Sequence, residues 1–212
     1  MSVLTVNAQC KKCRRAGEKL FLKGERCHSP KCALVKRNFP PGVHGEKGFR
    51  KLTNYGQQLM EKQKAKRLYG LRERQFRNYF DKAFRKVGNT GELLFGLLEK
   101  RLDNTIFRLG FASSRAKARQ LISHGHIMVN GKKVDIPSFQ TKAGDMIGLR
   151  ARALKSSLFA DLEQKLTEAK ENMAPWLMVD PKIYEGKITG QPKLGDVEMN
   201  INWQVIVEFY SK

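Results

Sequence analysis

Four cysteines lie within the first 32 residues, with the spacing Cys10-x2-Cys13-x13-Cys27-x4-Cys32. The members of each pair are close enough to bind one ion from a tight turn, and the 13-residue spacer lets the two pairs converge. Four thiolates in a tetrahedron are a ligand set that suits Zn²⁺. Because a shell of four sulfurs leaves no position for water, such a site would be structural rather than hydrolytic.

Other states of the same cysteines stay open. Residues 1–9 show neither the basic start nor the apolar run of a secretory signal, so we expect a reducing cytosolic setting, which disfavours two disulfides. An Fe–S cluster or free thiols would use the same side chains. His28 lies beside Cys27 and is an alternative ligand, but with four thiols present we expect it at the surface.

The charge balance points to a polyanionic partner. The 212 residues include 41 Lys and Arg against 20 Asp and Glu, a formal net charge of +21. Nucleic acid is the first expectation for such an excess. No apolar run reaches the ~18 residues that a membrane span needs, and no basic amphipathic helix with a Trp and Leu face supports binding to a membrane surface. We therefore expect a nucleic-acid partner and no membrane.

The positive charge is concentrated in two segments. Residues 1–89 hold 23 basic against 6 acidic side chains, and residues 100–160 hold 12 against 3. Residues 161–212 reverse the balance, with 6 basic against 9 acidic side chains. We expect the first two segments to supply the nucleic-acid surface, and the last to pack within the protein or contact another protein.

The elements around the first basic segment are a connector and two helices. Residues 38–48 contain two prolines and three glycines, which predict an extended connector. It either lies along a phosphate backbone or is a solvated linker. Helical patterns follow over 53–69, closed by Gly70, and over 71–87. The apolar stripe of the second helix favours core packing over base stacking and comprises Phe76, Phe80, Ala83, Phe84 and Val87.

The second basic segment has a helical start and a β end. A helix is predicted from an N-cap at Thr90 to Gly110, and a short helix over 115–123 with Ser114 as its N-cap. Arg115 and Arg119 are one turn apart, so with Ser114 and the helix N-terminus they form a corner suited to an anion. Residues 126–136 predict a hairpin around Asn130-Gly131, and 145–149 a third strand.

The last third is less regular. Leu154 to Ala169 predict an amphipathic helix, and residues 174–200 predict short β-like pieces between Pro and Gly. Residues 203–210 favour a strand by propensity, with a helix capped by Asn200 as the alternative.

Residues 101–149 resemble the S-four RNA-binding domain, and nearly the whole chain, in order, resembles the bacterial small-subunit ribosomal protein S-four family. The motifs within the domain are Arg101-Leu102-Asp103-Asn104, Leu109-Gly110-Phe111-Ala112, Ser114-Arg115, Ala118-Arg119-Gln120-Leu121-Ile122, His124-Gly125-His126, Val129-Asn130-Gly131 and Gly144-Asp145. Those outside it are the four cysteines, Pro40-Pro41-Gly42-x-His44-Gly45, Tyr55-Gly56, Glu61-Lys62-Gln63-Lys64, Tyr69-Gly70, Glu73-Arg74-Gln75-Phe76 and Val207-Glu208-Phe209-Tyr210-Ser211.

The resemblance implies an α+β chain, in which an N-terminal zinc knot and helical domain carry an inserted S-four domain of two helices and short antiparallel strands. We assign residues 1–45 to the zinc knot and extended arm, 46–98 to the helical domain, 99–196 to the S-four domain with a following helix and β-like pieces, and 197–212 to a C-terminal segment that packs back on the helical domain. The family also implies a helix over 203–210, which we adopt.

The implied function is that of a cytoplasmic, non-enzymatic constituent of the small ribosomal subunit. A member of this family binds the 5′ domain of small-subunit rRNA, nucleates assembly of the subunit body, and influences decoding accuracy near the mRNA entry channel beside neighbouring ribosomal proteins. We predict structural Zn²⁺ at the four cysteines. The predicted rRNA-binding residues are Arg14, Arg15, Arg50, Lys62, Lys66, Arg74, Arg77, Ser114, Arg115, Lys117, Arg119, His124 and Lys132.

The sequence has two alternative functions. Pseudouridine synthases also carry S-four domains, and Arg101-Leu102-Asp103 partly matches their catalytic motif, but Lys100 replaces its Gly and Asp103 falls within a leucine-periodic helix. We therefore expect Asp103 to be structural, paired with a nearby arginine. A DNA-binding zinc protein would need a helix that reads base edges, whereas dispersed charge suits a folded RNA.

Overall fold

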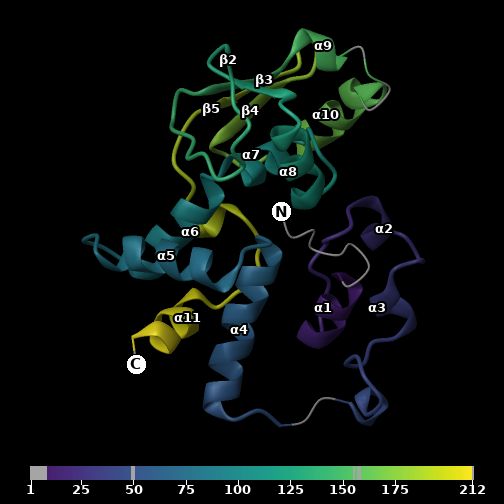
Figure 1. Ribbon diagram of the computed structural model, residues 1–212, viewed down its shortest axis with the longest axis vertical. Coiled ribbons are helices and arrows are strands. Elements are labelled where there is room, and N and C mark those ends of the chain that lie inside the picture. Colours follow the sequence, from purple (N-terminus) through teal and green to yellow (C-terminus); the bar gives the residue numbers. More distant parts are fainter. Residues whose placement is uncertain (1–8, 49–50, 155, 157–158, 212) are drawn as a thin grey trace. The chain divides into compact units, whose positions relative to one another are not determined.

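The structure is a computed structural model that describes residues 9–48, 51–154, 156 and 159–211 (Figure 1). The chain forms two compact units, one of residues 1–77 with 200–212 and one of residues 78–199. The boundaries of these units lie at 77/78 and 199/200. Tyr79 accepts a hydrogen bond from Arg101, which ties the end of α5 to the second unit. The domain assignment made from the sequence, with boundaries at 45/46, 98/99 and 196/197, stays a prediction.

The first unit is helical. Its elements are α1 (Gln9–Ala16), α2 (Glu25–His28), α3 (Ala33–Lys36), η2 (Gly45–Lys47), α4 (Asn54–Leu68), the beginning of α5 (Glu73–Phe84) and α11 (Trp203–Tyr210). The second unit combines helices with a sheet. Its elements are the remainder of α5, α6 (Thr90–Glu99), α7 (Leu102–Arg108), α8 (Arg115–Ser123), β1 (Ile127–Val129), β2 (Lys132–Lys133), β3 (Met146–Leu149), α9 (Ala151–Leu154), α10 (Leu162–Glu171), β4 (Leu177–Asp180), β5 (Glu185–Ile188) and η4 (Leu194–Asp196).

Helices α4 and α11 pack against each other at the centre of the first unit. The Thr53 side chain caps α4 by accepting a hydrogen bond from the Gly56 amide, and α4 ends before Gly70 as predicted. The buried ring of Trp203 lies 6.5 Å from that of Tyr69. The helix over 203–210 that the family resemblance implied is confirmed, but Asn202 caps it rather than Asn200.

The connector after α3 is attached to α1. Arg14 donates hydrogen bonds to the carbonyl oxygens of Phe39 (2.9 Å) and Pro40 (3.2 Å), and its guanidinium lies 4.7 Å from the centre of the Phe39 ring. Pro40 and Gly45 are buried, and a Cβ at Gly45 would collide with the Pro40 carbonyl. Arg14 therefore holds this part of the connector against α1, while residues 42–44 are exposed. The prediction of an extended connector is wrong at Gly45–Lys47, which form η2.

A five-stranded antiparallel sheet in the order β2-β1-β3-β5-β4 runs through the second unit. The predicted hairpin is confirmed, because β1 pairs with β2 through Asn130 and Gly131, both of which have a positive φ. The predicted third strand is β3, which pairs with β1. The β-like pieces of 174–200 include β4 and β5, which complete the sheet.

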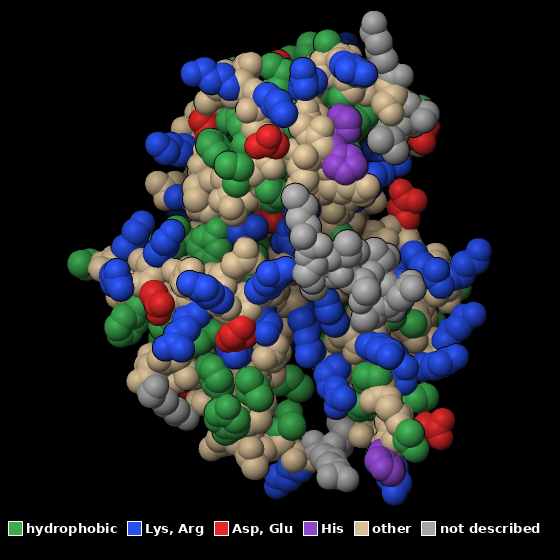
Figure 2. Space-filling view, viewed as in Figure 1, with side chains coloured by type: hydrophobic (Ala, Val, Ile, Leu, Met, Phe, Trp, Pro, Cys, Tyr) green, Lys and Arg blue, Asp and Glu red, His purple; other side chains and the backbone are tan. Residues whose placement is uncertain are grey.

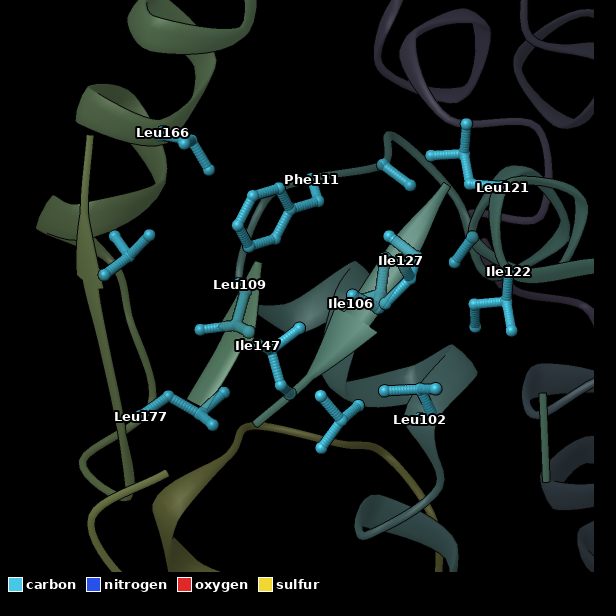
Figure 3. Packing of buried hydrophobic residues seen from close by; sticks show 14 of the residues in the cluster. Leu102, Ile106, Leu109, Phe111, Leu121, Ile122, Ile127, Ile147, Leu166 and Leu177 are labelled. Atoms are coloured by element: carbon cyan, nitrogen blue, oxygen red, sulfur yellow. The ribbon is translucent and has the colours of Figure 1, made fainter. Parts of the chain in front are cut away.

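The core of the second unit lies where α7, α8 and α10 meet the sheet (Figure 3). Ile106 of α7, Ile122 of α8 and Ile147 of β3 have no exposed surface. Gly186 of β5 lets the chain approach Leu109, since a Cβ there would lie 2.6 Å from the Leu109 Cδ1. Helix α7 is therefore packed closely against the sheet of the second unit.

Two predictions about helices in the second unit were wrong. The helix predicted from Thr90 to Gly110 is two helices, because Arg101 is extended and pairs with Gln140 in a β-bridge. Asn89, not Thr90, caps α6 by accepting hydrogen bonds from two amides. The helix predicted over 154–169 is confirmed for 162–169 by α10, which begins at Leu162, whereas Leu154 is the last residue of α9.

Helix α5 is shorter than predicted. It covers Glu73–Phe84 rather than 71–87, and only part of its apolar stripe is buried. Phe76, Phe80 and Ala83 are buried, but Phe84 is 59% exposed and Val87 fully exposed, so core packing was the wrong prediction for these two. The exposed Phe84 ring stacks on Phe80 at 5.8 Å.

Candidate nucleic-acid interface

The four cysteines come together in the N-terminal part of the first unit. Cys13 and Cys27 are buried, Cys10 and Cys32 are partly buried, and none forms a disulfide. Burial raises the pKa of the Cys13 thiol, a backbone hydrogen bond with Leu20 opposes this, and the nearby Cys27, Cys10 and Cys32 raise the pKa further. The Lys23 amide donates to the Cys27 sulfur at 3.3 Å. Cys13 is therefore close to each of the other three cysteines.

The thiols fit a zinc site in donor type, and zinc binding by them stays a prediction. Within the described ranges, no three His, Cys, Asp or Glu side chains are arranged so that they could hold a metal ion. His28 is exposed, as predicted, and its ring stacks on Phe21 at 4.8 Å.

Lys62 and Lys66 of α4 bind one carboxylate instead of facing solvent freely. Lys62 Nζ donates to Glu73 Oε1 at 2.7 Å and Lys66 Nζ donates to Oε2 at 2.8 Å. The Tyr210 hydroxyl adds a hydrogen bond of 2.8 Å to Oε1. Burial alone would raise the pKa of Glu73, but the hydrogen bonds from Lys62, Lys66 and Tyr210 lower it to about 2. The cluster joins α4, α5 and α11.

Only some of the predicted phosphate ligands of the first unit are open to solvent. Arg15 of α1 and the α5 residues Arg74 and Arg77 are exposed. Lys62 is only 5% exposed, and Arg14 binds the connector. Arg50 lies outside the described residues. Figure 2 shows Lys and Arg side chains over α1–α3 and α5, with few acidic side chains among them.

In the second unit, the structure confirms the predicted N-terminus of α8. Ser114 caps the helix by accepting a hydrogen bond from the Lys117 amide at 3.3 Å. Arg115 and Arg119 both extend toward α7, where Arg115 Nε donates to Asn104 Oδ1 (2.7 Å) and Arg119 Nε donates to Asp103 Oδ2 (2.6 Å). Their shared direction was predicted, and so was the pairing of Asp103 with a nearby arginine, but the contact of Arg115 with Asn104 was not.

The remaining predicted residues of the second unit are accessible. Lys132 in β2 is exposed, and Lys117 is partly exposed. His124 follows α8 as its C-cap and is exposed, with its ring 6.1 Å from that of His126. Together with the first unit's residues, these assignments stay predictions about rRNA contacts.

Asp103 is structural, as predicted, and pairs with two arginines. Arg101 forms a two-point contact with its carboxylate (3.1 and 2.9 Å), and Arg119 adds the third hydrogen bond. With a side chain 1% exposed, Asp103 has no access to a substrate. Glu99 is similarly buried and accepts two hydrogen bonds from Arg108.

Sequence reasoning missed two groups of residues. One group consists of residues that hydrogen-bond to the basic side chains, namely Glu73, Glu99 and Asn104. The only signal for them in the sequence was an acid or amide close to several arginines. The other group is a pair of exposed lysines, Lys82 and Lys86, near the end of α5. With Arg85, which the sequence already placed facing outward, they form a cationic tip.

Fixed and exposed guanidinium and ammonium groups in both units suit the binding of phosphates at many points. No helix in the described part of the chain combines the length and apolar character required to span a membrane.

Comparison with known proteins gives consistent matches along the chain. Residues 6–99 match the family described as ribosomal protein S4/S9 N-terminal domain, and residues 100–147 match the S4 domain. The small ribosomal subunit protein uS4A of Alkaliphilus metalliredigens is 53% identical over 206 residues, which cover 97% of this chain and 98% of that protein. The uS4 protein of Thermus thermophilus is 48% identical over 204 residues, 96% of each chain. The chain therefore belongs to the uS4 family of ribosomal proteins.

Proposed function

We propose that the protein is a structural, rRNA-binding constituent of the small ribosomal subunit in the cytoplasm. The observation that carries this function is family membership at about half identity over nearly the whole chain. The physical character of the chain agrees with it, since +21 of net charge is concentrated in two separate segments. The family is one of structural proteins, so the chain is not an enzyme.

The finer role concerns the RNA that is bound. We infer that the protein binds the 5′ domain of small-subunit rRNA and nucleates assembly of the subunit body. Exposed cations in both units support contacts with more than one RNA segment, because each unit offers its own set of phosphate ligands. A role in decoding accuracy near the mRNA entry channel belongs to the same proposal and rests on the resemblance.

Neighbouring ribosomal proteins are the expected partners of the less basic surface. Residues 161–212 carry 6 basic and 9 acidic side chains, unlike the rest of the chain. Several acids of α10 are exposed, including Glu163 and Glu168. Such a surface repels phosphates and is better suited to a basic protein.

We further propose structural Zn²⁺ at Cys10, Cys13, Cys27 and Cys32. Support comes from the donor set and from the closeness of Cys13 to the other three cysteines. The ion would join α1, α2 and α3, with ligands from Cys10 and Cys13 on α1, Cys27 on α2 and the adjoining Cys32. Binding requires thiolates, so the affinity would fall as the pH falls.

The test is equilibrium binding of the full chain to a transcript of the 5′ domain across a salt series, with an unrelated folded RNA as competitor. We expect a preference of about 100-fold, or about 2.7 kcal/mol, that persists at physiological salt. Replacement of Arg115, Lys117 and Arg119 by Ala should weaken binding and reduce the salt slope by roughly 0.7–0.9 per lost phosphate contact. Equal affinity for both RNAs would refute the rRNA assignment, and an unchanged slope would refute the second site.

A further inference from the structure

Four arginines converge on two buried carboxylates around α7. Arg101 and Arg119 bind Asp103, Arg108 binds Glu99, and Arg115 reaches the same cluster through Asn104. Glu99, Asp103 and Asn104 are each at most 2% exposed. An arginine stays protonated in proteins, so the two carboxylates leave a formal charge of +2 in the cluster.

The hydrogen bonds of Asp103 divide its two arginine partners into an inner and an outer one. Arg101 is 3% exposed, holds both carboxylate oxygens, and donates a further hydrogen bond of 2.7 Å to the Tyr79 hydroxyl. The side chain of Arg119 is 24% exposed and touches Asp103 through Nε. Since Nε is the innermost guanidinium nitrogen, this bond orients the group and leaves the terminal nitrogens farther out along the side chain.

Asn104 orients Arg115 in the same manner. Its amide nitrogen donates to the backbone oxygen of Glu99 (3.1 Å) and to Glu99 Oε2 (2.8 Å), which leaves the amide oxygen as the acceptor for Arg115 Nε. The Arg115 guanidinium also lies 4.5 Å from the centre of the Phe107 ring. A hydrogen bond at one edge and an aromatic ring on one face together fix the plane of this guanidinium.

We infer that Asp103 and Asn104 are positioning residues, which hold Arg119 and Arg115 in the orientation that binds rRNA phosphates. This inference rests on the proposed function. A long side chain that is immobilised before binding loses less conformational freedom when it binds, which is worth roughly two- to twelvefold in affinity for each side chain. The fold supplies the immobilisation from α7, whose buried end cannot touch the RNA itself.

The direction in which one substitution changes the affinity for RNA distinguishes positioning from simple electrostatics. Asp103→Asn removes a negative charge, so electrostatics alone would strengthen binding to a polyanion. Positioning predicts that Asp103→Asn weakens binding to the 5′-domain transcript by about two- to twelvefold. Asp135→Asn is the matched control, because Asp135 is exposed, belongs to the same unit and contacts Lys133 at 3.5 Å. The control should bind the transcript as tightly as the wild type or more tightly.

A double-mutant cycle completes the test. Affinity for the transcript is measured at one salt concentration for the wild type, Asp103→Asn, Arg119→Ala and the double variant, with circular dichroism to verify folding. We expect Asp103→Asn to have less than about a twofold effect once Arg119 is absent. An equal effect in both backgrounds, or tighter binding by Asp103→Asn, would overturn the inference.

A second pair guards against misfolding of Asp103→Asn, which leaves buried Arg101 without its full partner. Asn104→Ala changes no charge. It is combined with Arg115→Ala in a second double-mutant cycle, and we expect its effect on affinity to be less than about twofold once Arg115 is absent. Loss of 5′-domain preference in the wild type would refute the proposed function itself. If the wild type prefers the 5′ domain but the two substitutions of each pair act independently, the positioning inference alone is refuted.

Discussion

The stability of the first unit should depend on pH through Glu73. The pKa of Glu73 is lowered from its ordinary value of 4.5 to about 2 by hydrogen bonds from Lys62, Lys66 and Tyr210, despite the opposing effect of burial. A carboxyl with a lowered folded-state pKa contributes stability above its unfolded pKa, and the contribution is lost as the pH falls toward the folded pKa. The relevant window is therefore about pH 4.5 down to about pH 2.

The size of the effect is limited by solvent. The full shift would correspond to about 3 kcal/mol, but 44% of the Glu73 side chain is exposed, so screening weakens the interaction. We expect about 1–2 kcal/mol to be attributable to the cluster. Glu73→Gln removes this contribution and leaves Lys62, whose side chain is 7% exposed, without its carboxylate partner.

Trp203 offers a local probe, because it is buried against α4 and the only other tryptophan, Trp176, belongs to the second unit. Urea unfolding of Glu73→Gln and its parent would be followed by fluorescence in a Trp176→Phe background between pH 7 and pH 3. We expect a gap in the free energy of unfolding of about 1–2 kcal/mol at pH 7 that narrows below pH 4.5. The matched control is Glu46→Gln, since Glu46 is exposed. A gap that stays constant with pH, or one equal to that of the control, would refute the reasoning.

Three further predictions concern the metal, the exposed end of α5 and the sheet. Purified protein should contain about one zinc ion per chain by atomic emission, and Cys13→Ser should lose it together with part of the helical circular dichroism signal. Phe84→Ala should change the free energy of unfolding by less than about 0.5 kcal/mol, whereas Phe80→Ala should lower it by about 3–5 kcal/mol. The reason is that Phe84 is 59% exposed and Phe80 only 4%. Similar losses for the two variants in urea unfolding would contradict the exposed position of Phe84. Gly186→Ala should cost about 1–3 kcal/mol, since the new Cβ would meet Leu109, and an unchanged melting temperature would contradict this packing.

Local signals in the sequence were sufficient for several elements of the second unit. Ser114 caps α8 through an amide three residues away, and Asn130-Gly131 adopts the positive φ values of a tight hairpin. Each of these choices is decided by atoms within a few residues. The pairing of Asp103 was also predictable, because arginines lie near it in sequence and a buried carboxylate requires partners.

Features decided at long range were not predictable. The break between α6 and α7 depends on the pairing of Arg101 with Gln140, 39 positions farther along the chain. Lys62 was predicted to bind rRNA, yet it belongs to a cluster completed by the hydroxyl of Tyr210 at the other end of the chain. The helical spacing of apolar residues correctly identified the face of α5 that carries Phe84. Such spacing cannot show how far along the helix other elements bury that face.

The most direct test of the central claim is incorporation into the small ribosomal subunit. The full chain would be added to small-subunit rRNA with the other small-subunit proteins, and the particles separated on a sucrose gradient in high salt. The account predicts that the chain sediments with the particles at about one copy each, and that particles formed without it are incomplete. A chain that stays at the top of the gradient, while complete particles form without it, would contradict the claim.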